Sequence, residues 1–333
     1  MRVLAILCVK DEAAVLTEWL AHHRKIGVTD VLAFSNDCTD GTDAMLDRFE
    51  AMGLLTHMHG RSGQRGPQWR ALREAAEHPL MHVADWVICM DVDEFINVRA
   101  GGLPDLVAQV PQADCIALTW RMFGSNGLTR YEDAPVTQRF TRCAPDPLNW
   151  PWRCAMIKTL WRRGTHARPG VHRPLDPVGT PVWVDGNGAR LPERFAQRGV
   201  FTNYLAPSYG LVQLNHYALG DAESFVVKSA RGRANREGSP VDAGYWVERN
   251  FNQITDTSLQ VDCADLMADA QIARLHEAGV AWRHSRFVEL MREDAWRDLY
   301  TRVVMAGESR AWSAEDAHRI IALARGNTSG EGL

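Results

Sequence analysis

Apolar runs and helical patterns alternate along the first 95 residues of the chain. Contiguous apolar runs predict four buried strands, and apolar positions at helical spacing predict a helix after each of the first three. The predicted strands are 3–9, 31–35, 54–59 and 86–90, and the predicted helices are 13–26, 42–52 and 67–78. Strands that are apolar throughout and alternate with helices indicate a mostly parallel sheet with helices on both faces.

The pattern changes beyond residue 100. A helix over 103–110 and a strand over 115–122 precede a Pro- and Trp-rich stretch, 143–210, which predicts loops and short antiparallel strands. Helical spacing returns near 264–278, 282–306 and 313–325. The fold class predicted is α/β with a C-terminal helical extension.

Composition and charge narrow the class of protein. Hydrophobic residues make up 46% of the 333 residues, and 37 Lys and Arg stand against 41 Asp and Glu, which is typical of a globular protein without a bias toward nucleic acid. Seven Cys without a CxxC pair argue against a zinc or disulfide framework and favour a reducing compartment. No run of about 18 apolar residues occurs, so we expect a cytoplasmic protein, with peripheral membrane contact left open.

Asp91 and Asp93 directly follow the apolar run 86–90. In an extended backbone these two side chains share a face, while Glu94 points the other way. Ligands of open α/β sheets bind at the carboxyl ends of the strands, and carboxylates without Cys suit Mg²⁺ or Mn²⁺. The alternative is an ordinary solvated acidic loop.

Two further polar segments follow the first two strands. Lys10, Asp11 and Glu12 come after the first, and Ser35 to Thr42 after the second, where a tight turn leads into a helix. In a parallel sheet all three segments meet at one edge.

The segments VKDE, SNDCTDGT and DVDEF, in this order, resemble the GT-A glycosyltransferases, specifically the family 2 group and its relatives related to family 92. WRMFGSNG at 120–127 and LNHYALGDAESFVVKSARG at 214–232 are similar to further segments of that group. The resemblance covers most of residues 1–235. It implies a GT-A type fold and a metal-dependent glycosyltransferase that moves a sugar from a nucleoside-diphosphate sugar, UDP- or GDP-linked, to a saccharide, glycan, lipid-linked or other hydroxyl acceptor.

The resemblance also assigns regions and residues. It implies a nucleotide-sugar-binding half over 1–100, an acceptor-side half of the same domain over 101–262, a helical extension over 263–325 and a flexible tail over 326–333. The implied metal ligands are Asp91, Asp93 and His216, with His172 as a rival to His216. The implied contacts to the nucleotide are Lys10, Asp11, Glu12, Asn36, Asp37 and Asp91. The side chains of Arg65, Gln68, Lys228 and Arg231 suit ribose or phosphate oxygens, with a solvated helix face as the alternative for Lys228 and Arg231. Ser35 replaces the Asp that family 2 has there, so Asn36, Asp37 or Asp11 is the substitute contact to the base.

The catalytic base and the class of enzyme have alternatives. An inverting transferase needs a carboxylate that takes the proton of the acceptor hydroxyl, and the candidates are Glu132, Asp133, Asp185 and Glu193; a retaining enzyme needs none. A nucleotidyltransferase of similar fold is an alternative, although VKDE lacks a Gly-rich phosphate loop. A catalytically silent sugar-nucleotide-binding protein is another. Trp120, Trp150 and Trp152 are candidates for the acceptor side.

Overall fold

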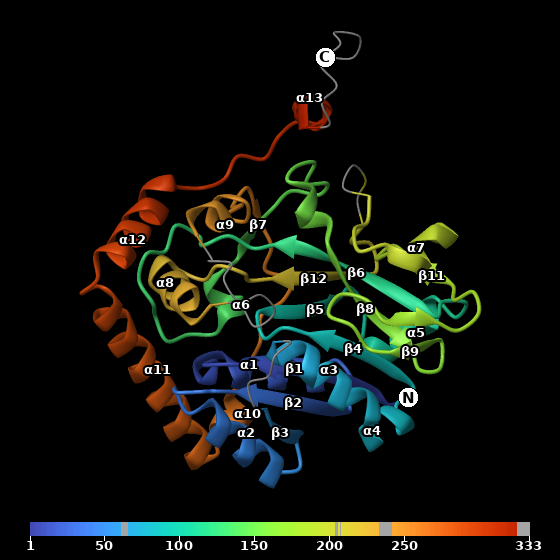
Figure 1. Cartoon of the computed structure of the whole chain (residues 1–333), viewed down its shortest axis with the longest axis horizontal. Coiled ribbons are helices and arrows are strands. Elements are labelled where there is room, and N and C mark those ends of the chain that lie inside the picture. Colours follow the sequence, from blue (N-terminus) through green and yellow to red (C-terminus); the bar gives the residue numbers. More distant parts are fainter. Residues whose placement is uncertain (61–65, 204–205, 207, 233–241, 325–333) are drawn as a thin grey trace.

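A nine-stranded mixed sheet forms the centre of the computed structural model, which describes residues 1–60, 66–203, 206, 208–232 and 242–324 (Figure 1). Its strand order is β3-β2-β1-β4-β8-β6-β12-β5, and β11 pairs with β6. The strands are β1 (Val3–Val9), β2 (Asp30–Asn36), β3 (Thr56–Gly60), β4 (Trp86–Met90), β5 (Glu94–Val98), β6 (Cys115–Met122), β8 (Ile157–Arg162), β11 (Trp183–Val184) and β12 (Val212–His216). Two short antiparallel pairs lie apart from it, β7 (Arg142–Cys143) with β13 (Ile254–Thr255) and β9 (His166–Arg168) with β10 (Leu175–Pro177).

The helices of the first half are α1 (Ala13–Lys25), α2 (Thr42–Ala51), α3 (Pro67–Glu77), α4 (Pro79–Val83) and α5 (Leu103–Gln109). Alternate residues of β1 enter two separate cores because successive side chains of a strand point to opposite faces. Val3, Ala5 and Leu7 pack with α1 and α2, whereas Leu4 and Ile6 pack with α3. Helices therefore cover both faces of the parallel strands β1 to β4, as the apolar runs predict.

The middle of the chain is more regular than its sequence pattern indicates. It contains α6 (Val136–Arg139), the 3₁₀ helix η1 (Trp152–Ala155), α7 (Glu193–Arg198), α8 (Ala222–Arg231) and α9 (Ala243–Val247). β8 lies between β4 and β6 and is antiparallel to both. β12 runs parallel to β6 and antiparallel to β5, the edge strand. The predicted α/β fold, with a mostly parallel sheet and a C-terminal helical extension, is confirmed.

The C-terminal helices are α10 (Ala264–Met267), α11 (Ala270–Leu290), α12 (Asp294–Ala306) and α13 (Ala314–Ala324). α11 packs against α1, α2 and α8, and α12 against α8 and α9 (Figure 1). The predicted break between 278 and 282 is wrong, since α11 continues through Gly279. The absence of a side chain at Gly279 lets α11 approach α1 closely. A Cβ at Gly279 would lie 2.7 Å from that of Ala13. Asp269 instead caps α11 by accepting from the backbone N–H groups of Gln271 and Ile272.

None of the helices in the described part of the chain has the length and apolar character needed to cross a membrane. The predicted tail, 326–333, lies outside the described residues.

Candidate active site at the carboxyl edge of the sheet

A cavity that is open to solvent lies where the polar segments after β1 and β4 meet α8. Its lining includes Asp11, Glu12, Asp93, Lys228 and Arg231, all of them predicted from the sequence to contact the nucleotide or metal. The parallel strands β1 and β4 end side by side, and His216 ends β12 opposite Met122 at the end of β6. The strand topology therefore gathers residues from four distant segments at one edge.

Hydrogen bonds join the loops that follow β1 and β2. Asp11 has a φ of 52°, and its Oδ1 accepts from the backbone N–H of Thr39 at 2.6 Å and from the Thr39 hydroxyl at 3.1 Å. Asp40 accepts from the backbone N–H groups of Ala13 and Thr42. Asp11 thus positions the second loop, while Asn36 donates to Asp37, which is exposed.

Asp91 is surrounded by donors from the protein. Its Oδ1 accepts from Gln68 at 3.3 Å, and its Oδ2 accepts from Nζ of Lys158 at 3.0 Å. The Lys158 side chain is fully buried and also lies 3.5 Å from Oε2 of Glu94. Burial alone would lower the pKa of Lys158, but the carboxylates of Asp91 and Glu94 outweigh it and raise that pKa above its ordinary value. Lys158 is therefore an ammonium ion beneath the site, a residue that the sequence pattern did not single out.

Glu94 fixes the turn between the two aspartates. Burial raises the pKa of Glu94 to about 8. Its carboxyl group accepts from Nε1 of Trp120 at 2.7 Å and from the backbone N–H of Asp91 at 2.9 Å. Trp120, a candidate for the acceptor side, is buried by this contact, and its ring centroid lies 4.3 Å from that of His216. Trp120 therefore packs beneath the site, and Trp150 is partly exposed; the side chain of Trp152 lies outside the described part.

Asp93 lies between Lys228 and His216. Nζ of Lys228 donates to Asp93 Oδ2 at 2.6 Å, and Nε2 of His216 lies 3.7 Å from Asp93 Oδ1. Burial would raise the pKa of Asp93, but Lys228 and His216 hold it well below its ordinary value. Burial lowers the pKa of His216, which favours the neutral ring that can bind a metal.

Two of the three predicted ligands, Asp93 and His216, present donor atoms that suit a divalent cation. Asp93 Oδ1 and His216 Nε2 face each other, and carboxylate oxygen and imidazole nitrogen are both ligands that Mn²⁺ accepts. Both oxygens of Asp91 already accept hydrogen bonds, and the ligand atoms of Asp91, Asp93 and His216 do not all lie within 4.8 Å of one another. His172, the rival ligand, donates from Nδ1 to the backbone oxygen of Ile157.

Three buried polar atoms of residues predicted for the site have no partner among the described residues. They are Asn36 Oδ1, Gln68 Oε1 and His216 Nδ1. Buried polar atoms are nearly always hydrogen-bonded in folded proteins, so these unpaired atoms indicate groups that a ligand could complete.

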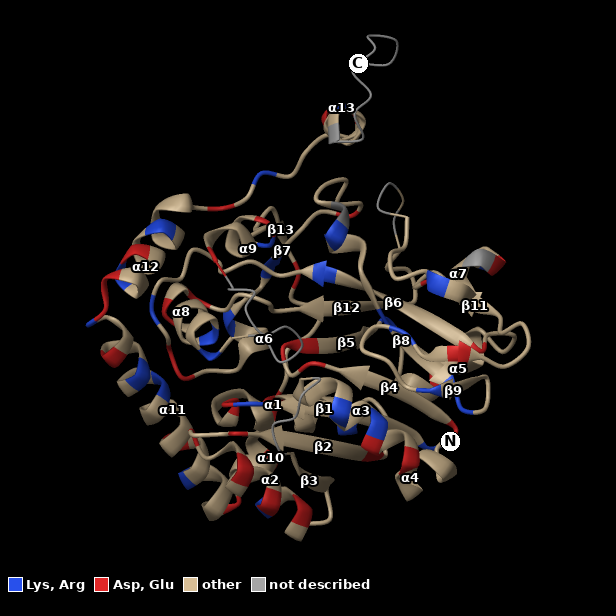
Figure 2. Ribbon diagram, in the orientation of Figure 1, with Lys and Arg blue, Asp and Glu red and all other residues tan. Residues whose placement is uncertain are grey.

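Basic side chains from three helices line the cavity. Arg231, on α8, donates to the backbone oxygen of Lys10 and to Glu12. Arg139 on α6 and Arg283 on α11 also line the cavity, and Arg283 Nη2 lies 4.0 Å from Glu12 Oε2. Figure 2 shows basic residues on α8 and α11, whereas the strands of the sheet are largely uncharged. The sequence pattern did not predict Arg139 or Arg283 as residues of the site. Gly279, one helical turn before Arg283, is a signal in the sequence that this face of α11 approaches α1.

The four candidate bases lie elsewhere in the described structure. Asp133 Oδ1 is 2.8 Å from Nε2 of His276, and Glu132 and Glu193 are exposed. Asp185 accepts from the backbone in its own turn, and it follows β11, which pairs with the first residues of β6, at the end away from the cavity. None of the four lines the cavity, and Arg65 lies outside the described residues.

Residues 5–144, which include the first two loops and the Asp91 to Phe95 segment, match the model of glycosyltransferase family 92. The chain is related to glycosyltransferase family 92. This match confirms the predicted relation for this part of the chain. The comparison with curated proteins gave no match.

Among solved structures, the chain is similar to TarS from S. aureus, residues 1–349, in complex with UDP, at 19% identity and a TM-score of 0.32. The likeness covers 50% of this chain and 48% of that one, so the chain spans about half the length of this relative. It is also similar to a putative glucose-1-phosphate thymidylyltransferase from Bacillus anthracis, at 9% identity and a TM-score of 0.30, over 50% of this chain and 73% of that one.

Proposed function

We propose that the chain transfers a sugar from a nucleoside-diphosphate sugar to a hydroxyl acceptor, with a divalent cation held by Asp93 and His216. The observation that supports this most is the cavity at the carboxyl edge, which Asp93, Lys228 and Arg231 line together. A diphosphate needs both a cation site and basic donors, and this edge supplies them within one cleft.

The donor fits this edge by its chemistry. Lys228 and Arg231, which line the cavity, donate to diphosphate oxygens. The unpaired Oδ1 of Asn36 and Oε1 of Gln68, outside the cavity lining, accept from N–H or O–H groups of the nucleoside. UDP- and GDP-sugars both carry such groups. The acceptor, a saccharide, glycan, lipid-linked or other hydroxyl compound, enters from the open side of the cavity.

The leaving diphosphate gains negative charge as the glycosidic bond breaks. Mn²⁺ or Mg²⁺, when bound, stabilises that charge as a Lewis acid. Lys228 and Arg231 add two fixed positive charges, which stabilise the transition state more than the ground state because the charge develops next to them. Glu94 holds the backbone N–H of Asp91 and so fixes the turn that presents Asp93.

Calorimetry with UDP and GDP, each with and without Mn²⁺, tests the proposal. We expect binding that depends on Mn²⁺ and is lost in Asp93→Asn, while Asp298→Asn, an exposed carboxylate of α12 paired with Arg302, binds as the unaltered chain does. Absence of Mn²⁺-dependent binding for every nucleoside diphosphate would remove the proposal. Release of pyrophosphate from a nucleoside triphosphate and a sugar phosphate would support a nucleotidyltransferase instead.

A further inference from the structure

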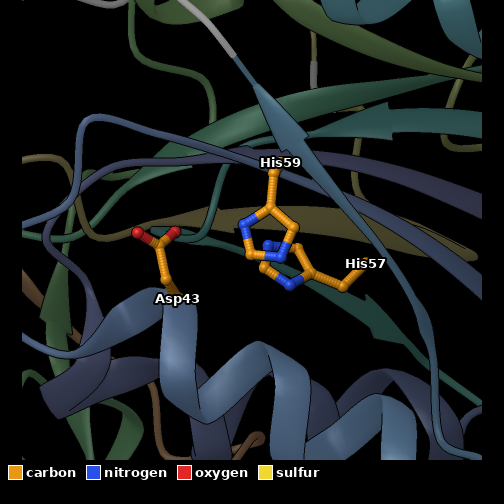
Figure 3. Close-up of side chains that lie close together, drawn as sticks. All are labelled: Asp43, His57 and His59. Carbon is orange, nitrogen blue, oxygen red and sulfur yellow. The ribbon is translucent and has the colours of Figure 1, made fainter.

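A second group of ligand-type side chains lies at the β2–β3 side of the sheet. Asp43 in the first turn of α2 and His57 and His59 on β3 place one ligand atom each within 4.8 Å of one another (Figure 3). None of the three lines the cavity described above. The two histidines are two residues apart on a strand, so they project from the same face.

A fourth residue, Asp47, orients both rings. His57 Nδ1 lies 2.7 Å from Asp47 Oδ1, and His59 Nε2 lies 3.2 Å from the same oxygen. A carboxylate can only accept, so each ring directs an N–H at Asp47 and keeps a lone pair on its other nitrogen. Histidines that bind metals usually donate their second nitrogen to a carboxylate in this way.

The two remaining nitrogens have different surroundings. Nε2 of His57 accepts from the hydroxyl of Ser35 at 2.8 Å, and a hydroxyl can rotate away to release that lone pair. Ser35 and His59 are paired in the register of β2 and β3, so the backbone keeps this corner in place. Nδ1 of His59 faces the other way from Asp47, and Figure 3 shows the rings of His57 and His59 lying beside the Asp43 carboxylate.

Asp43 supplies the negative charge of the group. Its Oδ1 is buried, and within the described part of the chain it has no hydrogen-bond partner. An unpaired buried carboxylate oxygen is costly unless a cation or donor satisfies it. The two imidazole rings beside it, with Asp47 taking their N–H groups, present lone pairs and therefore do not satisfy it themselves.

We propose that Asp43, His57 and His59 bind a divalent transition-metal ion of the zinc class, with Asp47 orienting both rings and solvent in the fourth position. Two imidazoles and one carboxylate are a ligand set that zinc accepts in tetrahedral geometry. Ligands about 2.1 Å from one zinc ion lie about 3.4 Å apart, so the three atoms need only small side-chain adjustments.

This site differs from the proposed transferase site in ligands and in preferred metal. Two histidines favour Zn²⁺ or Co²⁺ over Mg²⁺. The hydrogen bonds from both rings to an orienting carboxylate, Asp47, have no counterpart at Asp93. The absence of a CxxC pair, which argues against a cysteine zinc site, does not bear on a site built from His and Asp. The His-x-His spacing on β3 is the sequence signal.

The experiment uses the full chain, freed of metal by a chelator, in the Asp93→Asn background, so that the cleft does not contribute. Zn²⁺ binding is measured by calorimetry, and Co²⁺ binding by its visible absorption, which reports the coordination geometry. We expect about one tight site with the bands of a four-coordinate ion.

Variants of the metal ligands and of the orienting residue Asp47 are expected to change Zn²⁺ affinity to different extents. Asp43→Asn and His59→Gln, both at partly or fully exposed positions, should abolish tight Zn²⁺ binding while circular dichroism stays unchanged. Asp47→Asn should weaken it by about 10- to 100-fold, since it alters only the support of the rings. No tight Zn²⁺ site in the parent, or undiminished binding in both ligand variants, would overturn the proposal, whereas nucleotide binding in the chain with intact Asp93 tests the transferase separately.

Discussion

The ammonium group of Lys228 lies beside Asp93, where a divalent cation bound by Asp93 would also lie. It donates to Asp93 Oδ2 at 2.6 Å and to the backbone oxygen of Ala218. The same side chain lines the cavity. Lys228 therefore keeps Asp93 ionised, and under the proposed function it becomes available to a diphosphate once metal is bound.

Replacing Lys228 with Met should separate these two roles. The variant should bind Mn²⁺ alone more tightly, since the competing ammonium is gone, yet bind UDP with Mn²⁺ more weakly. Without metal its free energy of unfolding should fall by about 2 kcal/mol, because the partly buried Asp93 carboxylate is left unpaired. Calorimetry and urea unfolding measure both effects. Lys25→Met, at an exposed position of α1, is the control, and equal Mn²⁺ affinity in the two variants would contradict the competition.

Lys158 is a second buried charge with a different task. It is fully buried between Asp91 and Glu94, so Lys158→Met should lower the free energy of unfolding by about 3–5 kcal/mol by leaving Glu94 without its cation. Adding Glu94→Gln should recover part of that loss, which a double-mutant cycle in urea measures. Strictly additive effects would show that the two side chains are not coupled.

At the scale of elements, two histidines of α1 connect this helix to β5. His22 Nε2 donates to the backbone oxygen of Ile96 at 2.7 Å, and His23 Nε2 accepts from the backbone N–H of the same residue at 3.3 Å. Burial lowers the pKa of His22 to about 4 from its ordinary 6.5. Burial, with the neighbouring His22, also holds the pKa of His23 well below its ordinary value. Both rings are therefore neutral in the folded chain.

Protonation of these rings should make the chain acid-sensitive. A group whose pKa is lower in the folded state contributes stability above its unfolded pKa, and that stability is lost as the pH falls through the folded pKa. The free energy of unfolding should thus fall between pH 6.5 and 4, by about 2 kcal/mol at pH 5 from His22 alone. Urea unfolding at several pH values measures this. His22→Gln, which keeps an N–H donor, should flatten the profile, and an unchanged profile would assign the sensitivity to other groups.

The contact of α11 with α1 is the other element-scale feature that bears on the cleft. Gly279 allows the close approach, and Arg283 lies one turn further along the same helix. Gly279→Ala should push α11 away from α1 and cost about 1–3 kcal/mol by overpacking, despite the better helix propensity of Ala.

Because Arg283 moves with α11, Gly279→Ala should also weaken UDP binding. Thermal unfolding and calorimetry on the same preparations check both effects. Ser285→Ala, an exposed position of α11, serves as the control. Normal UDP affinity in a destabilised Gly279→Ala chain would show that Arg283 is not part of the nucleotide site.

At the scale of the whole molecule, the parallel half could be predicted because its strands are buried on both faces. Such strands read as unbroken apolar runs, and Val3–Val9 and Trp86–Met90 occur as the runs predict. Loops that follow parallel strands meet at one edge of the sheet, which is why the sequence alone was enough to group Asp11, Glu12 and Asp93 there.

The strands beyond the parallel half and the basic residues of the cavity could not be predicted, because they depend on contacts between residues that are distant in the sequence. β8 contains a fully buried Lys158, which interrupts the apolar pattern and is acceptable only beside Asp91 and Glu94. β5 begins at the equally buried Glu94. Arg139 and Arg283 reach the cavity from α6 and α11, and neither has a local signature of ligand binding. Buried ion pairs and converging helices become visible only when the chain is folded.

The position of Arg283 in chain order has a consequence for biosynthesis. α11 follows every strand of the sheet, so a chain growing on the ribosome presents the parallel half and its loops first. Folding during synthesis proceeds from the N-terminal end, and the early strands can form their core before α11 leaves the exit tunnel. The nascent chain therefore has Asp11, Glu12 and Asp93 before Arg283 arrives, and the lining of the cavity is complete only once α11 has left the exit tunnel.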